Sequence, residues 1–463
     1  MRTGVSVALA LLIAAPAAAQ NKEPTTYDRA IAAGYKALTL CSGIFNAGRT
    51  QAQIEALELK GIYPQYDAIL PTLKATVEHT KGSFTAKVTV PFDDKIPART
   101  AYWSRDRGCT VMPIGSVHQW LELLTTRAPY RPRTDADRLI WPAGDAEAET
   151  KPAANATALA TTVSGALGEA FGTGARTTAT IVVQNGKIIA EKYRDGFGPH
   201  ISQRTWSVAK SLTGTLMGIG AHKGLLAVNQ KADIPEWKAD IDPRQEITID
   251  QLLRMASGLH SETAGNRTDA LYFGGTTVTQ EVTAWPLDAM PGTRFRYANN
   301  DIVLAMRALR AKAGDEVYAA FPQKELFDRI GMTRTVAETD WQGNFILSSQ
   351  VWSTARDLAR FGLLYLNDGI WNGERILPEG WVKYVTTPSG PQPEGEFGYG
   401  ATFWLMSRSP GVPADTYAAF GNRGQYVVIV PSRKVVIVRR GEDPAGARFD
   451  IAKFTADVLA ALE

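Results

Sequence analysis

The order in which strand and helix patterns follow one another most constrains the fold of this 463-residue chain. Two apolar runs within residues 178–193 flank Asn185-Gly186, which is a strong β-hairpin signal. Helical patterns dominate from Ser207 to about residue 366, and strands are then predicted over 399–406, 417–420, 425–430 and 434–439. Strands at both ends with helices between them predict an α+β fold, an antiparallel β-sheet flanked by helices with an all-helical subdomain.

The first third of the chain carries patterns of its own. Residues 27–40 predict a helix, and residues 84–90 alternate like a strand. The stretch from 131 to 154 combines three prolines with alanine and charged residues, which is typical of a linker. We therefore expect a small N-terminal accessory domain at 20–130, a linker at 131–154 and a second domain at 155–463. That second domain is predicted to begin and end with helices, at 156–171 and about 447–462.

Residues 1–19 have the pattern of a secretory signal peptide. Arg2 is followed by a short apolar run, and Ala17-Ala18-Ala19 offers small residues for cleavage before Gln20. The alternative is an N-terminal membrane anchor, but the apolar run is short for a bilayer span. We expect an exported protein, periplasmic or secreted, without a stable membrane anchor.

Charge and cysteine content narrow the class of protein further. The net charge is only +3 and the sequence has no run rich in lysine or arginine, so we expect no nucleic-acid partner. The only two cysteines are Cys41 and Cys109. In an exported protein such a pair predicts a disulfide, the alternative being two free buried thiols.

The first candidate for chemistry is Ser207-Val208-Ala209-Lys210, at the predicted start of a helix that ends at Gly224. Residues three apart on a helix share a face, so the Lys210 amine can reach the Ser207 hydroxyl. A serine needs a nearby base to become a nucleophile, and a desolvated lysine can serve. The N–H groups of a helix start also favour an oxyanion. The alternatives are a serine that only caps the helix and a solvated surface lysine.

A second candidate pair is Tyr297 and Asn299, two residues apart on a predicted loop. The phenol can relay protons and the amide can bind substrate or hold the lysine. The same Tyr-x-Asn pattern recurs at Tyr365 and Asn367, at the end of an amphipathic run, where packing and a helix stop explain it more simply. We therefore place the catalytic tyrosine at Tyr297.

The third candidate is Gly421-Asn422-Arg423-Gly424-Gln425, which leads into a predicted strand. Glycine lets the backbone approach a ligand closely, and strand N–H groups can supply an oxyanion donor. We expect Gly424 and Gln425 to line the substrate site. The alternative is an ordinary glycine-rich turn.

With these three motifs in order, the chain from about 155 to 460 resembles the serine β-lactamase-like hydrolases. It is most similar to the group of class C β-lactamases, D-Ala-D-Ala carboxypeptidases, family VIII esterases and 6-aminohexanoate-dimer hydrolases. Residues 247–259 and 353–362 also match this group. The resemblance implies acylation of Ser207, with general acid and base duty shared by Lys210 and Tyr297. It implies that Asn299 contacts the lysine or the substrate, and that the N–H groups of Ser207 and Gln425 form the oxyanion hole.

One departure from the family pattern bears on the substrate. Penicillin-recognising members carry Lys or His, then Thr or Ser, then Gly in the third motif, where this chain has Asn422-Arg423-Gly424. The cation that meets a substrate carboxylate is thus absent from its usual place, although Arg423 can partly substitute. This favours an amidase or esterase acting on a small-molecule amide or ester.

Two other functions stay open at this stage. One is a β-lactamase or D-Ala-D-Ala carboxypeptidase, and the other is a catalytically silent periplasmic binding or sensor protein. His222 and His260 are interpreted as structural. Because the five histidines show no metal-ligand spacing, we expect neither a metal nor another cofactor. The oligomeric state has no signature in the sequence.

Overall fold

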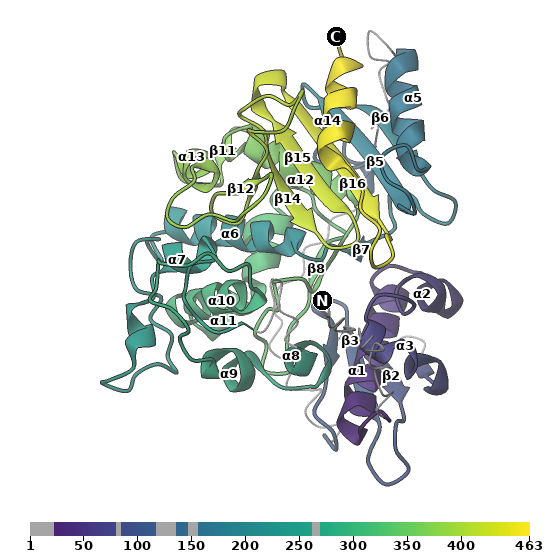
Figure 1. Ribbon diagram of the computed structural model, residues 1–463, viewed down its shortest axis with the longest axis vertical. Helices are drawn as coiled ribbons and strands as arrows, with labels where there is room; N and C mark the ends of the chain where they lie inside the picture. The colour runs from purple at the N-terminus through teal and green to yellow at the C-terminus, as the bar shows by residue number, and fades with distance from the viewer. Residues whose placement is uncertain (1–22, 80–84, 117–135, 147–155, 262–268) are drawn as a thin grey trace, which may run out of the picture.

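A seven-stranded antiparallel sheet forms the centre of the hydrolase-like region (Figure 1). The computed structural model describes residues 23–79, 85–116, 136–146, 156–261 and 269–463. The strand order is β12-β13-β14-β15-β16-β5-β6. The strands are β5 (Thr177–Gln184), β6 (Lys187–Tyr193), β12 (Gly398–Tyr399), β13 (Trp404–Leu405), β14 (Tyr417–Gly421), β15 (Gln425–Val430) and β16 (Val435–Gly441).

Helices cover both faces of this sheet, which explains why residues 427–430 of β15 and 435–438 of β16 are all apolar. On β15, Val427 and Ile429 belong to the core shared with α6 (Val208–His222) and α12 (Ala355–Leu366). Val428 and Val430 point the other way, into the core formed with α5 (Ala156–Leu167) and α14 (Ile451–Ala460). The period-2 alternation of the strand thus builds two cores from one apolar run.

A helical region follows α6 and lies to the lower left of the sheet in Figure 1. It contains α7 (Ile249–Leu253), α8 (Asp269–Phe273), α9 (Val278–Glu281), α10 (Asn299–Ala313) and α11 (Asp315–Pro322). Beside it, β7 (Gln203–Arg204), β9 (Val351–Ser353) and β8 (Val336–Ala337) form a small antiparallel sheet. Shorter elements complete the chain, namely α13 (Trp381–Thr386) and the hairpin of β10 (Ile370–Trp371) and β11 (Glu374–Arg375).

The N-terminal region packs against the rest of the molecule at the lower right of Figure 1. It comprises α1 (Thr26–Phe45), α2 (Gln51–Leu57), α3 (Pro64–Asp67) and a four-stranded meander of β1 (Thr76–His79), β2 (Thr85–Val90), β3 (Arg99–Ser104) and β4 (Gly108–Val111). Thr25 and Asp28 form a capping box that starts α1. A disulfide joins Cys41 of α1 to Cys109 of β4, which confirms the predicted pairing. Among the described helices, none is long and apolar enough to cross a membrane.

The predicted fold class is confirmed, and so is the hairpin at Asn185-Gly186. Both turn residues have positive φ angles and β5 pairs with β6 across them, as a tight two-residue turn requires. The prediction of one continuous strand at 399–406 was wrong, because the structure has two short strands there, β12 and β13. Between β12 and β13 the chain leaves the extended conformation, with Thr402 at φ 65° and its N–H donating to the Leu253 carbonyl. The two pieces therefore form a hairpin rather than one strand.

The proposed division at residues 131–154 remains a prediction, but its described part is packed rather than extended. Asp145 is paired with Arg360 at 2.6 Å, and the Trp141 indole donates to the Gly186 carbonyl at 3.0 Å. These contacts fasten residues 136–146 to the sheet and to α12. The predicted signal peptide lies outside the described residues.

Replacing both Cys41 and Cys109 by serine should lower the free energy of unfolding by about 4 kcal/mol. The physical reason is that the disulfide closes a loop with a sequence separation of 68 residues, which restricts the unfolded chain. Chemical denaturation of the oxidised wild type and the double variant measures this difference. An unchanged denaturation midpoint would contradict the expectation.

Candidate active site

Ser207 lies where strand β7 turns into helix α6. The preceding Trp206 has a left-handed φ of 50°, and the Thr205 N–H is fixed by the Val351 carbonyl at 2.8 Å. Ser207 occupies the N-cap position, but its side chain makes no capping hydrogen bond. The hydroxyl is half-buried and is therefore available for chemistry rather than used as a cap.

Lys210 stands one turn further along α6, with its Nζ 3.1 Å from Ser207 Oγ. It is only 1% exposed, and it donates to Asn299 Oδ1 at 2.5 Å and to the Ser348 carbonyl at 3.0 Å. Burial, helped by the positive charge of Arg204, lowers the Lys210 pKa to about 7. A lysine in this state is about half unprotonated at neutral pH.

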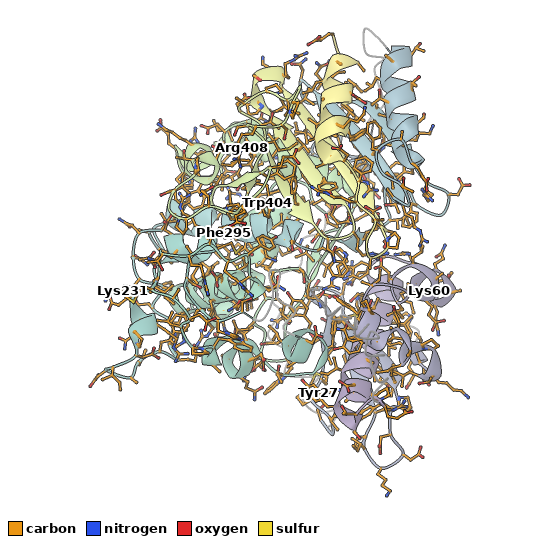
Figure 2. The ribbon with its side chains drawn as sticks, viewed as in Figure 1. Tyr27, Lys60, Lys231, Phe295, Trp404 and Arg408 are labelled. Carbon is orange, nitrogen blue, oxygen red and sulfur yellow. A yellow bond between two sulfur atoms is a disulfide. The ribbon has the colours of Figure 1, made fainter. Side chains whose placement is uncertain are left out.

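Tyr297 brings a phenol to the same place. Its ring centroid is 5.0 Å from Lys210 Nζ, and its hydroxyl is hydrogen-bonded with the Ser207 side chain. Burial raises its pKa well above the ordinary value, so this tyrosine stays neutral at physiological pH. Trp404 packs on it with ring centroids 5.4 Å apart, and Figure 2 shows Trp404 near Phe295, between the sheet and the helical region. Phe295 and Trp404 both pack against Tyr399, and the three rings line this side of the site.

Asn299 begins helix α10 and is 5% exposed. Its amide oxygen accepts the hydrogen bond from Lys210, so it holds the lysine rather than projecting into open solvent. Two residues later, Asp301 is buried and accepts hydrogen bonds from the Ser257 side chain and N–H. Burial raises the pKa of Asp301 to about 7, and its negative charge in turn favours protonated Lys210.

The end of β14 approaches the nucleophile through Gly421. An ideal Cβ built on Gly421 would lie 3.2 Å from the Ser207 nitrogen and would collide with the Thr205 carbonyl. A glycine is therefore needed for the strand to reach the start of α6. This close approach places the backbone that follows Gly421 beside the Ser207 N–H.

The structure places Gly424 and Gln425, the expected substrate-site residues, in other surroundings. A Cβ at Gly424 would collide with the paired side chains of Arg439 and Asp443. The Gln425 side chain is 1% exposed, donates to the Arg423 and Gly441 carbonyls, and accepts from Arg440 Nε at 2.6 Å. The Gly424 backbone and the Gln425 side chain therefore pack against β16 and the segment that follows it.

Arg423 does not serve as the free cation that the sequence suggested. It is 5% exposed, and its guanidinium contacts the carboxylates of Glu58 and Glu442. The correction has a physical reason, since a charge this deeply buried must be paired. Arg423 is therefore committed to ion pairs within the protein.

The second Tyr-x-Asn pattern belongs to the core. Tyr365 is 1% exposed and shares a 2.8 Å hydrogen bond with Thr215, while Asn367 ends helix α12. His260 pairs with Asp288 at 2.8 Å, and His222 is exposed in the last turn of α6. These surroundings agree with the structural interpretation of all four residues.

Sequence reasoning missed Ser348, Arg204 and Asp301 as parts of the site, and it named Gly421 only as the first residue of the third motif. Ser348 contributes only its main-chain carbonyl, which any residue type can offer. Arg204 acts on Lys210 through its charge and stacks over the Trp206 ring at 3.9 Å. Only Gly421 carried a usable signal, because it stands at the head of the glycine-rich motif.

One group of potential metal ligands occurs among the described residues, Asp137, Asp145 and His200, whose ligand atoms lie within 4.8 Å of one another. Arg334 contacts Asp137 with two hydrogen bonds of 2.6 Å, and Arg360 contacts Asp145. Because these guanidinium groups already neutralise the carboxylates, we interpret the group as an ion-pair network. Asp137 and Asp145 lie on the described part of the predicted linker, and His200 follows β6.

Comparison with known proteins identifies similar hydrolases and β-lactamases. The chain is 24% identical over 315 residues to the 6-aminohexanoate-dimer hydrolase of Paenarthrobacter ureafaciens, covering 58% of this chain and 73% of that protein. A solved structure from Bacillus anthracis, whose assignment as a 6-aminohexanoate-dimer hydrolase is itself provisional, has a TM-score of 0.52 and 24% identity over 61% of this chain and 78% of its own. A class C β-lactamase has a TM-score of 0.51 and 16% identity, covering 67% and 96% of the two chains.

The family model described as Beta-lactamase matches residues 167–461, which include the serine, the lysine, the tyrosine and the end of β14. The resemblance inferred from the three motifs is therefore confirmed. The fold, an antiparallel sheet with helices on both faces, is also that of the solved relatives. This chain belongs to the beta-lactamase family.

Proposed function

We propose that this protein is an exported serine hydrolase that cleaves a small amide or ester through an acyl-enzyme on Ser207. The observation that carries the proposal is the contact between Ser207 Oγ and a buried lysine whose pKa is about 7. A neutral amine within 3.1 Å is a competent general base for a serine hydroxyl. Family membership supports hydrolase chemistry in general, and the contact between Ser207 and Lys210 supports a serine nucleophile with a lysine base.

The proposed reaction begins with transfer of the Ser207 proton to the neutral Nζ of Lys210. The serine oxygen then forms a bond to the substrate carbonyl carbon, and the carbonyl oxygen becomes an oxyanion. The Ser207 N–H at the start of α6 and the N–H that follows Gly421 are the donors we assign to this oxyanion. We place the second donor directly after Gly421 rather than at Gln425, because Gly421 approaches the Ser207 nitrogen so closely that an added Cβ would lie 3.2 Å from it.

Collapse of the tetrahedral intermediate breaks the bond to the leaving nitrogen or oxygen. Tyr297 donates its phenol proton to that atom and regains a proton from the Lys210 ammonium. Water then repeats the sequence on the acyl-enzyme and restores Ser207. The raised pKa of Tyr297 keeps its phenol protonated, and the lowered pKa of Lys210 allows a neutral amine near pH 7, so we assign the donor role to Tyr297 and the base role to Lys210.

Two observations favour a small amide or ester over a β-lactam or D-Ala-D-Ala peptide. Arg423 is consumed by internal ion pairs, so it offers no charge to a substrate carboxylate. The curated relative named above is a hydrolase of the 6-aminohexanoate dimer. Export is proposed from the signal-like residues 1–19 and agrees with the Cys41–Cys109 disulfide, which is typical of oxidising compartments.

A substrate panel tests the proposal. Purified wild type is assayed with 4-nitrophenyl esters of short acids, with linear dimers and oligomers of 6-aminohexanoate, and with a chromogenic cephalosporin. We expect turnover of an ester or an amide that is lost in Ser207→Ala. Cephalosporin turnover of equal efficiency would favour the β-lactamase alternative, and ligand binding without any turnover would favour the binding-protein alternative.

The pH dependence of kcat/KM should report the Lys210 amine. Below a pH of about 7 the lysine is protonated and has no lone pair to accept the serine proton, so activity should rise with pH through about 7 and then level off. Steady-state assays with a neutral ester measure the profile. Asp301→Asn should move the rising limb only slightly to lower pH, because the Asp301 carboxyl, whose own pKa is about 7, carries part of its negative charge where Lys210 titrates. A flat profile for the wild type would contradict this account.

Gly421→Ala should lower kcat/KM by about 100-fold, the usual cost of losing one oxyanion donor. The added methyl collides with the Thr205 carbonyl and displaces the strand from the Ser207 N–H. Gly198→Ala is the matched control, because nothing lies within 4 Å of its added Cβ. Both variants are assayed beside their melting temperatures. Full activity in a folded Gly421→Ala protein would argue against the assigned oxyanion site.

A further inference from the structure

A buried ion pair links the N-terminal region to the loop between β14 and β15. Glu58 directly follows helix α2, and its carboxylate lies 2.7 Å from the Arg423 guanidinium. The same guanidinium donates to the Leu57 carbonyl at 2.7 Å. The side chains of Glu58 and Arg423 are 4% and 3% exposed, so the contact is closed to solvent.

The ionised form of Glu58 is maintained by this arrangement. Burial alone would raise its pKa, but the positive charges of Arg423 and Arg49 outweigh burial and hold the pKa below the ordinary value. On the other side, Arg423 contacts the Glu442 carboxylate and donates to the Asp443 carbonyl at 3.1 Å. Arg423 therefore fastens the end of α2 to the segment after β16.

Arg423 has a strained backbone, as does Trp206, which directly precedes the nucleophile. Its φ is 58°, and that of Trp206, directly before Ser207, is 50°. Non-glycine residues in this left-handed region cost free energy and persist when their surroundings impose them. The N-terminal region contacts both residues, through Glu58 at Arg423 and through Tyr63, whose ring centroid is 6.2 Å from that of Trp206.

The position of Arg423 in the chain connects this strain to catalysis. It lies two residues after Gly421, the glycine that approaches the Ser207 nitrogen, and directly after the N–H that we assign to the oxyanion. The backbone between them forms the turn of the β14–β15 hairpin, in which Gly421 pairs with Gln425. A shift of the Arg423 guanidinium would therefore move the backbone of this hairpin turn, and with it the N–H that we assign to the oxyanion.

We propose that Glu58 is a positioning residue for the hydrolase reaction. By pairing with Arg423, Glu58 holds the turn at 421–425 in the position where both oxyanion donors point at the substrate carbonyl oxygen. The N-terminal region therefore contributes to the geometry of the active site. The inference rests on the proposed function. It assigns to this region a role in acyl transfer beyond covering the hydrolase core.

Glu58→Gln tests the proposal, because it keeps the shape of the side chain and removes its charge. We expect kcat for a 4-nitrophenyl ester to fall roughly 10-fold or more with KM changed less than about 3-fold, since a displaced donor acts in the transition state. The matched control is Glu338→Gln. Glu338 is also a buried carboxylate across the same boundary, where it accepts from Ser42, Asn46 and the Cys109 N–H. This variant should lose thermal stability and keep kcat.

A double-mutant cycle separates positioning from general destabilisation. If Glu58 acts through Arg423, then Glu58→Gln should have no further effect on kcat in an Arg423→Met background, or in an Arg423→Gln background if the methionine variant does not fold, because both substitutions remove the positive charge. Equal losses of kcat in Glu58→Gln and Glu338→Gln, or additive effects in the cycle, would overturn the proposal. A wild type that hydrolyses none of the esters and amides of the substrate panel would instead refute the proposed function itself, so the two failures are distinguishable.

Discussion

The site around Ser207 depends on the burial of one amine. Lys210, surrounded by α6, α10 and the Ser348 carbonyl, loses the hydration that normally keeps an amine protonated. The positive charge of Arg204 disfavours protonation further. Asn299 and Ser348 still provide oxygen atoms for its N–H groups, so the amine is held without being neutralised by a carboxylate. Burial and the Arg204 charge lower its pKa and the Asp301 charge raises it, which leaves the pKa at about 7, where a base is most useful. Asp301, which is buried behind it, moderates the shift through its own charge.

The second constraint is steric and belongs to the sheet. Strand β14 can supply a donor next to Ser207 only if it approaches the start of α6 more closely than a side chain allows, and Gly421 permits that approach. Residues outside the family domain then hold the end of β14 close to the start of α6. Glu58 and Tyr63, both N-terminal to residues 167–461, contact Arg423 and Trp206, the two left-handed residues on either side of this junction. The N-terminal region and the hydrolase core thus share one set of buried contacts.

Local signals were predictable from the sequence, and long-range ones were not. Ser207 and Lys210 are one helical turn apart, so their spacing alone indicated their contact, and alternating apolar residues indicated the strands. The third motif contains two glycines three residues apart, and only the tertiary approach to Thr205 and Ser207 distinguishes Gly421 from Gly424. Arg423 pairs with Glu58 across 365 residues of sequence, a distance at which no local pattern is informative. Ser348 acts through its backbone, which has no sequence signature at all.

The central claim is that Ser207 is a nucleophile activated by its surroundings. The most direct measurement is the intact mass of the folded protein after treatment with a fluorophosphonate, with peptide mapping of the product and Ser207→Ala treated in parallel. The account predicts a single adduct on the wild type, located on Ser207 and absent from the variant. A folded wild type that gains no adduct, or that is labelled at another serine, would contradict it.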